Sequence, residues 1–256
     1  MSEGPAIVVT IGDREGIVIW DGRPSHDFIQ VEWKDDGTRS EVIHVENVKN
    51  LPGEPWEGRA SSETPKYGNG TDYWDDRYRK QPDPFEWLKG WDDLRGLIEE
   101  LTERNTNRTI LNIGCGNSLL TEKMYDHGYT NIINGDISTV VIEQMARRNQ
   151  HREKMLWRVV DAQKMAFDDR SFFLVIDKSV LDTFACSSNS YLQIETYLNE
   201  VRRVLVDKGV FICVSFGQPE DRKHFFDSNL SDFRFRQEEF AGGTGNKHYA
   251  YILTKP

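Results

Sequence analysis

The sequence of 256 residues predicts an α/β protein, in which a mostly parallel sheet is covered by helices and preceded by a small all-β domain. In the larger, C-terminal part, five apolar runs alternate with segments of helical spacing, which is typical of a parallel sheet with right-handed crossovers. Near the end, "FRFRQEEF" and "KHYAYILT" flank "AGGTGN" and predict an antiparallel hairpin. The first fifty or so residues instead contain short β-rich runs.

The β-rich runs at the N-terminal end are "IVVTI", "GIVIW", "FIQVEW" and "EVIHVENV". Two of the breaks contain Asp-Gly dipeptides, which favour tight turns. We expect a small antiparallel barrel over residues 1–52, and its spacing and size are similar to those of SH3-like barrels. Two interpretations fit Trp20, Phe28 and Trp33: an aromatic pocket for a methylated or proline-rich peptide, or ordinary packing of a small β core.

Residues 53–72 are rich in Pro, Gly, Ser and charged residues, which is the composition of a linker. We therefore place the second domain at 73–256. Helices are expected there over 91–104, about 118–127, 138–149 and 191–205, with Ser138 as a helix cap. Strands are expected over 109–113, 131–136, 156–161, 171–177 and 209–216, followed by the hairpin of 233–240 and 247–254.

Composition and sequence patterns exclude several classes of function. A net charge of −10 argues against a nucleic-acid backbone as the main partner. No run approaches the ~18 apolar residues of a membrane span, and the start lacks the pattern of a secretion signal, so we expect a cytoplasmic protein without membrane contact. Cys115, Cys186 and Cys213 lie far apart and the histidines lack ligand spacing, so we expect neither a disulfide framework nor a metal site.

"ILNIGCGNSLLTE", from Ile110 to Glu122, joins a predicted strand to a predicted helix through Gly114 and Gly116. Glycines allow a sharp turn there and let backbone N–H groups approach a ligand. In an open parallel sheet such turns face the ligand at the carboxyl ends of the strands. A tight turn without a ligand explains a lone Gly-x-Gly equally well.

Three acidic residues change that balance. Asp136, Asp161 and Asp177 each end an apolar run, so their carboxylates should meet at one sheet edge, where like charges repel unless a ligand offsets them. A pyrophosphate fits poorly, and Leu119 replaces the third glycine of dinucleotide sites. A ligand with ribose hydroxyls, an adenine amino group and a positive centre fits better, which describes S-adenosyl-L-methionine. Asp136 would bind the ribose, and Asp161 with Ala162 the adenine.

A family resemblance rests on these residues. "ILNIGCGNSLLTEKMYDHGYTNIINGDIS" and "VVDAQKMAFDDRSFFLVIDKSVLDTF" resemble the class I, seven-β-strand S-adenosylmethionine-dependent methyltransferases. They are most similar to the group that contains the elongation factor 1-alpha lysine methyltransferases. "DYWDDRYRKQPDPFEWLKGWDDL" is similar to that group's aromatic N-terminal element. The resemblance spans about residues 72–254 and implies a Rossmann-like, seven-strand, mostly parallel sheet with a C-terminal hairpin.

The resemblance also implies a cofactor site with an N-terminal lid over 73–92. No catalytic side chain is expected, because methyl transfer relies on positioning and water exclusion. The group's Glu and Gly correspond here to Asp177 and Ser179. The implied cofactor-binding residues are Trp74, Tyr78, Trp87, Gly114, Cys115, Gly116, Asn117, Asp136, Ile137, Asp161, Ala162, Asp177 and Lys178.

The function that the resemblance implies is protein-lysine N-methylation, with elongation factor 1-alpha as an expected acceptor. One alternative keeps the cofactor but methylates a small molecule. Another is a non-catalytic binding or scaffold protein. Asp75, Asp76, Glu86 and Asp182 are candidates for recruiting the acceptor lysine, although solvated helix faces explain such charges equally well.

Overall fold

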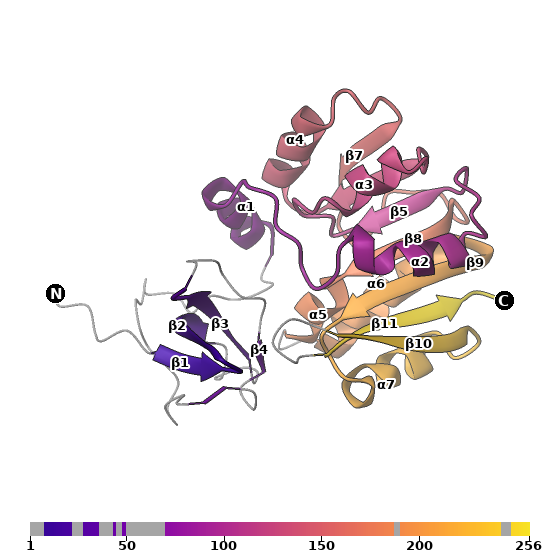
Figure 1. Ribbon diagram of the computed structural model, residues 1–256. Coiled ribbons are helices and arrows are strands. Elements are labelled where there is room, and N and C mark those ends of the chain that lie inside the picture. Colours follow the sequence, from indigo (N-terminus) through magenta and orange to yellow (C-terminus); the bar gives the residue numbers. More distant parts are fainter. Residues whose placement is uncertain are drawn as a thin grey trace. The chain divides into compact units, whose positions relative to one another are not determined.

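The computed structural model describes residues 8–21, 28–35, 43–44, 48–49, 70–186, 190–241 and 247–256 (Figure 1). The chain divides into two compact units. One comprises Met1–Lys66 and Ala241–Lys247, and the other Tyr67–Phe240 and His248–Pro256. Residues 53–69 of the expected linker lie outside the described residues, as does any closure of the N-terminal strands into a barrel.

The smaller unit contains an antiparallel sheet of four strands in chain order, which confirms the predicted N-terminal β-structure. The strands are β1 (Val8–Ile11), β2 (Arg14–Asp21), β3 (Phe28–Trp33) and β4 (Ile43–His44). Alternate side chains of the first three strands form one buried cluster, since successive residues of a strand face opposite sides of the sheet. The cluster includes Val9, Val18 and Val31.

The larger unit contains a seven-stranded sheet in the order β10-β11-β9-β8-β5-β6-β7. Its strands are β5 (Ile110–Ile113), β6 (Ile132–Asp136), β7 (Met155–Val159), β8 (Phe172–Lys178), β9 (Leu205–Ser215), β10 (Arg234–Ala241) and β11 (Lys247–Thr254). Strands β7, β6, β5, β8 and β9 are parallel, and β11 pairs antiparallel with β9. The predicted parallel sheet with its C-terminal hairpin is therefore confirmed.

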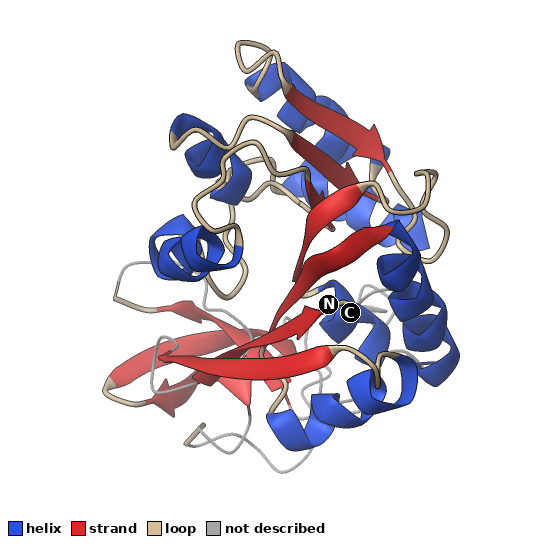
Figure 2. Cartoon of the chain, turned by 90° about the vertical axis from the view of Figure 1, so that its right-hand side faces the viewer, coloured by secondary structure: helices blue, strands red, loops and turns tan. Residues whose placement is uncertain are grey.

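Helices cover both faces of this sheet (Figure 2). The apolar residues of α2 (Trp91–Leu101) and α3 (Leu120–Asp126) pack on one face, and α4 (Thr139–Arg148) lies beside α3. The other face is covered by α5 (Val180–Ala185), α6 (Ser190–Val204) and α7 (Pro219–Asn229). As predicted, Ser138 caps α4 by accepting a hydrogen bond from the Val141 amide.

Three of the described helices have no counterpart among the predicted elements: α5, α7 and α1 (Gly70–Lys80). Helix α5 has only six residues, too few for a helical repeat to show. Helix α7 buries two consecutive phenylalanines rather than an apolar stripe. Helix α1 begins inside the segment expected to be a linker. Most of its residues are polar and Tyr78 is its one buried side chain, so it has no apolar stripe that would predict a helix.

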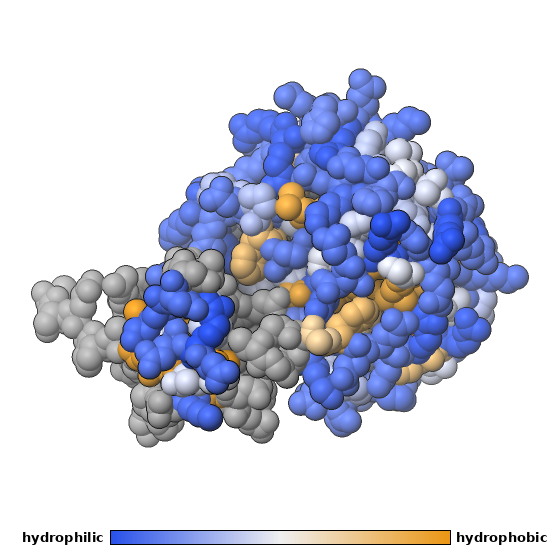
Figure 3. All heavy atoms as spheres, viewed as in Figure 1, coloured by the Kyte–Doolittle hydropathy of each residue, from blue (hydrophilic) through white to orange (hydrophobic). Residues whose placement is uncertain are grey.

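Most of the larger unit's surface in Figure 3 is hydrophilic. None of the described helices is long and apolar enough to cross a membrane. A few large apolar side chains of the described residues are nevertheless exposed: Val8, Leu119, Leu156, Val159, Tyr191 and Leu192.

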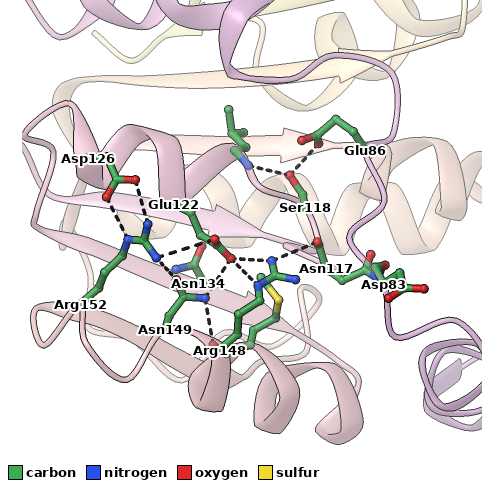
Figure 4. A network of polar contacts seen from close by, with 12 residues as sticks. Asp83, Glu86, Asn117, Ser118, Glu122, Asp126, Asn134, Arg148, Asn149 and Arg152 are labelled. Atoms are coloured by element: carbon green, nitrogen blue, oxygen red, sulfur yellow. Dashed lines mark hydrogen bonds and ion pairs between the residues drawn. The ribbon is translucent and has the colours of Figure 1, made fainter.

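A buried carboxylate joins α3 to α4 (Figure 4). Glu122 is 9% exposed, and its Oε1 accepts hydrogen bonds from Arg148 Nε at 2.6 Å and Asn149 Nδ2 at 3.0 Å. Arg152 adds an ion pair with Glu122 and a two-bond contact with Asp126. Removing one partner of such a network leaves the other charges poorly compensated.

We therefore expect Glu122→Ala to lower the free energy of unfolding by about 2 kcal/mol. Glu143→Ala is the matched control, because the Glu143–Arg147 pair is 3.8 Å apart and largely exposed. That change should stay within about 0.5 kcal/mol. Urea unfolding of both variants measures the difference, and equal effects would contradict the structural role of Glu122.

Candidate active site

A pocket opens at the carboxyl ends of β5, β6, β7 and β8, where the strand order reverses and open α/β sheets bind ligands. Nine of the thirteen residues predicted for the site line this pocket. They are Trp74, Tyr78, Trp87, Gly114, Asp136, Ile137, Asp161, Ala162 and Lys178. Four do not: Cys115, Gly116, Asn117 and Asp177.

The glycine turn after β5 requires both of its glycines. Gly114 and Gly116 have φ angles of +63° and +51°, which L-residues with side chains adopt at a cost. A Cβ on Gly114 would lie 2.0 Å from Val180 Cγ2, and one on Gly116 would lie 2.8 Å from the Tyr78 hydroxyl. The turn is therefore fixed by conformation and by packing together.

Asp136 is the buried acid of the pocket. Its Oδ2 accepts a hydrogen bond from the Gly116 amide at 2.9 Å, and its Oδ1 accepts one from the Ser138 amide at 3.0 Å. Burial raises the pKa of this carboxyl to about 6, although these hydrogen bonds oppose the rise. The carboxylate keeps lone pairs that can accept hydrogen bonds from ligand hydroxyls.

Asp161 is exposed and follows β7, the neighbour of β6 in the sheet. Its Oδ1 accepts a hydrogen bond from the Gln163 amide at 2.8 Å, which orders the loop beside Ala162. Asp136 and Asp161 both line the pocket, so the expected convergence of carboxylates holds for these two residues. The end of the pocket beside β6 and β7 is therefore acidic.

Asp177 lies behind the pocket wall rather than on it. It is fully buried, and it accepts hydrogen bonds from the Val180 amide at 2.7 Å, the Leu181 amide at 3.1 Å and the Tyr197 hydroxyl at 2.9 Å. Burial raises the pKa of the Asp177 carboxyl to about 7, against the effect of these donors. Asp177 thus fixes the start of α5, whose residues Val180 and Phe184 line the pocket.

The N-terminal arm, residues 70–90, is held on the pocket by polar contacts that sequence reasoning missed. Asp75 Oδ1 accepts a hydrogen bond from Ser138 Oγ at 2.6 Å and a longer one from the Val140 amide, at the start of α4. Asn117 Nδ2 donates to the carbonyls of Gln81 and Asp83, and Figure 4 shows Asn117 beside Asp83. Asn117 therefore binds the backbone of the arm and does not line the pocket.

Lys178 connects the sheet to the same arm. It is 7% exposed, its Nζ forms an ion pair with Glu86, and it lies 3.3 Å from Ser118 Oγ. Ser118 in turn donates a hydrogen bond to Glu86 Oε1 at 2.6 Å (Figure 4). At the end of the pocket beside β8, the positive charge of Lys178 is therefore balanced by Glu86. The end beside β6 and β7 is acidic instead.

The acidic residues considered for lysine recruitment have internal partners. Asp182 is 1% exposed and contacts Arg222 and the Ser215 hydroxyl. Glu86 pairs with Lys178, and Asp75 accepts a hydrogen bond from the Ser138 hydroxyl. Asp76 is exposed, but it pairs with Lys80 at 2.7 Å. None of the four presents an unpartnered carboxylate to the pocket.

Ser179 lines the pocket between Lys178 and α5. Its φ of +72° is a left-handed conformation that favours glycine, the residue at this position in the group that the sequence resembles. Its buried hydroxyl has no hydrogen-bond partner among the described residues. A buried hydroxyl without a partner on a pocket wall is a site where a ligand can supply the missing bond.

Other candidates have structural explanations where the structure describes them. Trp33 is 5% exposed in the core of the small sheet, which favours packing over a peptide pocket. The side chains of Trp20 and Phe28 lie outside the described residues. Within the described ranges, no three His, Cys, Asp or Glu residues are grouped to hold a metal ion, and Cys115, Cys186 and Cys213 are free thiols.

Comparison with known proteins supports a methyltransferase fold. Residues 111–213 match the family model described as "Methyltransferase domain". EEF1A lysine methyltransferase 4 of Mus musculus is 31% identical over 193 residues, which cover 72% of this chain and 74% of that protein. The eEF1A lysine and N-terminal methyltransferase of Xenopus laevis is 36% identical over 151 residues, or 57% of this chain. This chain covers only 22% of the Xenopus protein.

Solved structures show the same fold at low sequence identity. The N-methyltransferase NodS from Bradyrhizobium japonicum, solved in complex with S-adenosyl-L-homocysteine, aligns with a TM-score of 0.54 and 17% identity. The alignment covers 71% of this chain and 93% of NodS.

The glycine turn gives a direct test of the pocket's architecture. We expect Gly114→Ala to lower the free energy of unfolding by about 2 kcal/mol or more, because the new Cβ meets Val180 and the left-handed conformation is strained. Gly96→Ala is the matched control, since Gly96 lies inside α2 with open space around it. Ala should stabilise that helix by about 0.5–1 kcal/mol. Effects of the same sign in thermal unfolding would contradict the turn described here.

Proposed function

The chain belongs to the S-adenosylmethionine-dependent methyltransferases, and we propose that it methylates a lysine side chain of elongation factor 1-alpha. The observation that carries the acceptor is the similarity to EEF1A lysine methyltransferase 4 over about three quarters of both chains. The proposal also places the protein in the cytoplasm, where that factor serves translation. The first curated relatives are much longer than this chain, so their further activities are not transferred to it.

The residues that line the pocket support the proposed cofactor. Asp136 would hold the ribose hydroxyls with its remaining lone pairs, and the loop of Asp161 and Ala162 would meet the adenine. Gly114 would leave room for the methionine part, which a Cβ would restrict. Trp74, Tyr78 and Trp87 would form the covering wall, where a ring face near the sulfonium contributes roughly 0.5–2 kcal/mol.

The chemistry needs positioning more than reactive side chains. When bound, the cofactor supplies a methyl carbon on sulfur, and the carbon–sulfur bond breaks as a neutral amine forms the carbon–nitrogen bond. Trp74, Tyr78 and Trp87 line the pocket and would exclude water from it once the cofactor is bound. A lysine must first lose a proton, and its ordinary pKa is about 10.4. Desolvation favours that loss, and the Lys178–Glu86 ion pair removes the net negative charge that would oppose it.

The two alternatives make different predictions. A small-molecule methyltransferase would put the transferred methyl into the low-molecular-mass fraction of a lysate, whereas a protein methyltransferase would label a discrete protein band. A non-catalytic scaffold would bind no cofactor. The similarity to lysine methyltransferases favours the protein acceptor.

Asp136 should make cofactor affinity depend on pH. Its raised pKa of about 6 means that the carboxylate is mostly ionised at pH 7 and mostly protonated at pH 5. Because only the ionised form accepts all of its hydrogen bonds, the Kd of S-adenosyl-L-homocysteine should rise about tenfold from pH 7 to pH 5. Isothermal titration calorimetry measures it.

Asp136→Asn should weaken this binding and abolish its pH dependence, because the Asn amide cannot titrate and its NH₂ faces a backbone donor. Asp161→Asn should weaken binding but keep the pH dependence, since Asp136 remains. An Asp136→Asn variant that still binds more weakly at pH 5 would refute the role given to Asp136.

The acceptor is tested with purified elongation factor 1-alpha and cofactor labelled in its methyl group. We expect label in a single lysine by peptide mass spectrometry, and Asp136→Asn should reduce the transfer strongly. Label confined to small molecules would support the first alternative. Label on the N-terminal amine of the factor alone would contradict the lysine assignment.

A further inference from the structure

We propose that Tyr191, Leu192 and His224 form a docking surface for the acceptor segment that flanks the target lysine, and that this segment presents an apolar and a basic side chain. The proposal rests on the proposed function, because it concerns how a protein acceptor reaches the same pocket. We call these three residues, with their acidic neighbours Glu195, Glu220 and Asp221, the α6–α7 patch.

The patch contains exposed apolar side chains that lie against other aromatic rings. Tyr191 is 71% exposed and Leu192 is 67% exposed, in the first turn of α6. The Tyr191 ring lies 5.8 Å from the His224 ring and 5.4 Å from that of Phe225, and the latter two rings are 3.9 Å apart. Aromatic rings held by neighbours lose little conformational entropy when a partner covers them.

The patch lies at the same sheet edge as the pocket. Helix α6 connects the parallel strands β8 and β9, so its first turn lies near their carboxyl ends. Helix α7 starts directly after β9 and therefore begins at that edge too. Phe184, on the pocket wall, lies 5.4 Å from Tyr197 of α6, which makes α5 and α6 a continuous support from the pocket to the patch.

Charge indicates the chemistry of the occupant. Glu195 is one turn after Tyr191 on α6, and Glu220 and Asp221 are in the first turn of α7, one turn before His224. All three acids are exposed. The nearby cation Lys223 pairs with Asp227 at 2.5 Å, so the patch is acidic overall. A segment with a basic and an apolar side chain complements it, and a lysine acceptor is part of such a segment.

The exposed apolar residues of β7 do not form a comparable surface. Leu156 and Val159 are three positions apart on a strand, so they face opposite sides of the sheet. Leu156 also pairs with Ile133, the second residue of β6, away from the carboxyl edge. Leu156→Ala therefore serves as a matched control for loss of an exposed leucine.

The test is steady-state methylation of elongation factor 1-alpha by the full chain. The double variant Tyr191→Ala with Leu192→Ala should raise the KM for this acceptor about 5- to 20-fold, as expected for loss of interface anchors. The Kd of S-adenosyl-L-homocysteine should stay unchanged, which shows that the pocket is intact. Leu156→Ala should leave both constants unchanged.

A second double variant tests the contribution of the acidic residues. Glu220→Lys with Asp221→Lys should raise the KM for the acceptor relative to the unmodified chain, and the rise should be larger at low salt than at high salt, because added salt screens exposed charges. Unchanged KM in both double variants, with normal cofactor binding, would overturn the docking surface while leaving the proposed function in place. Failure of the unmodified chain to methylate the factor, despite cofactor binding, would instead overturn the proposed acceptor and the docking surface with it.

Discussion

The buried carboxylate of Asp136 is the constraint on which the pocket depends. Its two oxygens accept backbone hydrogen bonds from the turn after β5 and from the start of α4, so one side chain fixes two loops. Helix α4 then holds the N-terminal arm, through the cap that it shares with Asp75 and the bond from Gln144 to the Tyr78 carbonyl. Burial destabilises the charged form of this carboxylate and so raises its pKa. Such perturbed groups are typical of functional sites, and here the remaining lone pairs can bind a ligand.

The order of the strands arranges chemistry along the pocket. From β7 through β6 and β5 to β8, the carboxyl ends present an exposed acid, a buried acid, a glycine corner and a lysine paired with Glu86. This polarity supports the proposed direction of the cofactor, with the nucleoside at the acidic end. The methyl group would then lie beside β8 and α5, near the Ser179 hydroxyl, which has no hydrogen-bond partner among the described residues. The α6–α7 patch continues from this end, so a protein acceptor would approach from there.

Sequence patterns predicted the parts of this arrangement that depend on local periodicity. The apolar runs located the strands, and Asp136 and Asp161 followed because they end two of them. Contacts between distant segments left no such signal: nothing in the sequence shows that Ser118 meets Glu86, or that Asn117 reaches the carbonyls of residues 81 and 83. Asp177 was expected at the same edge as Asp136 and Asp161, but it does not line the pocket, for a reason that strand geometry explains. Neighbours on a strand face opposite sides, so Lys178 lines the pocket while Asp177 turns to Tyr197.

The most direct test of the central claim is a crystal structure of the protein with S-adenosyl-L-homocysteine. We expect the ribose hydroxyls within hydrogen-bond distance of Asp136, the adenine beside Asp161 and Ala162, and the sulfur near Gly114 on the side of Lys178. A nucleoside bound in the reverse direction, or outside the pocket formed by these strand ends, would contradict it.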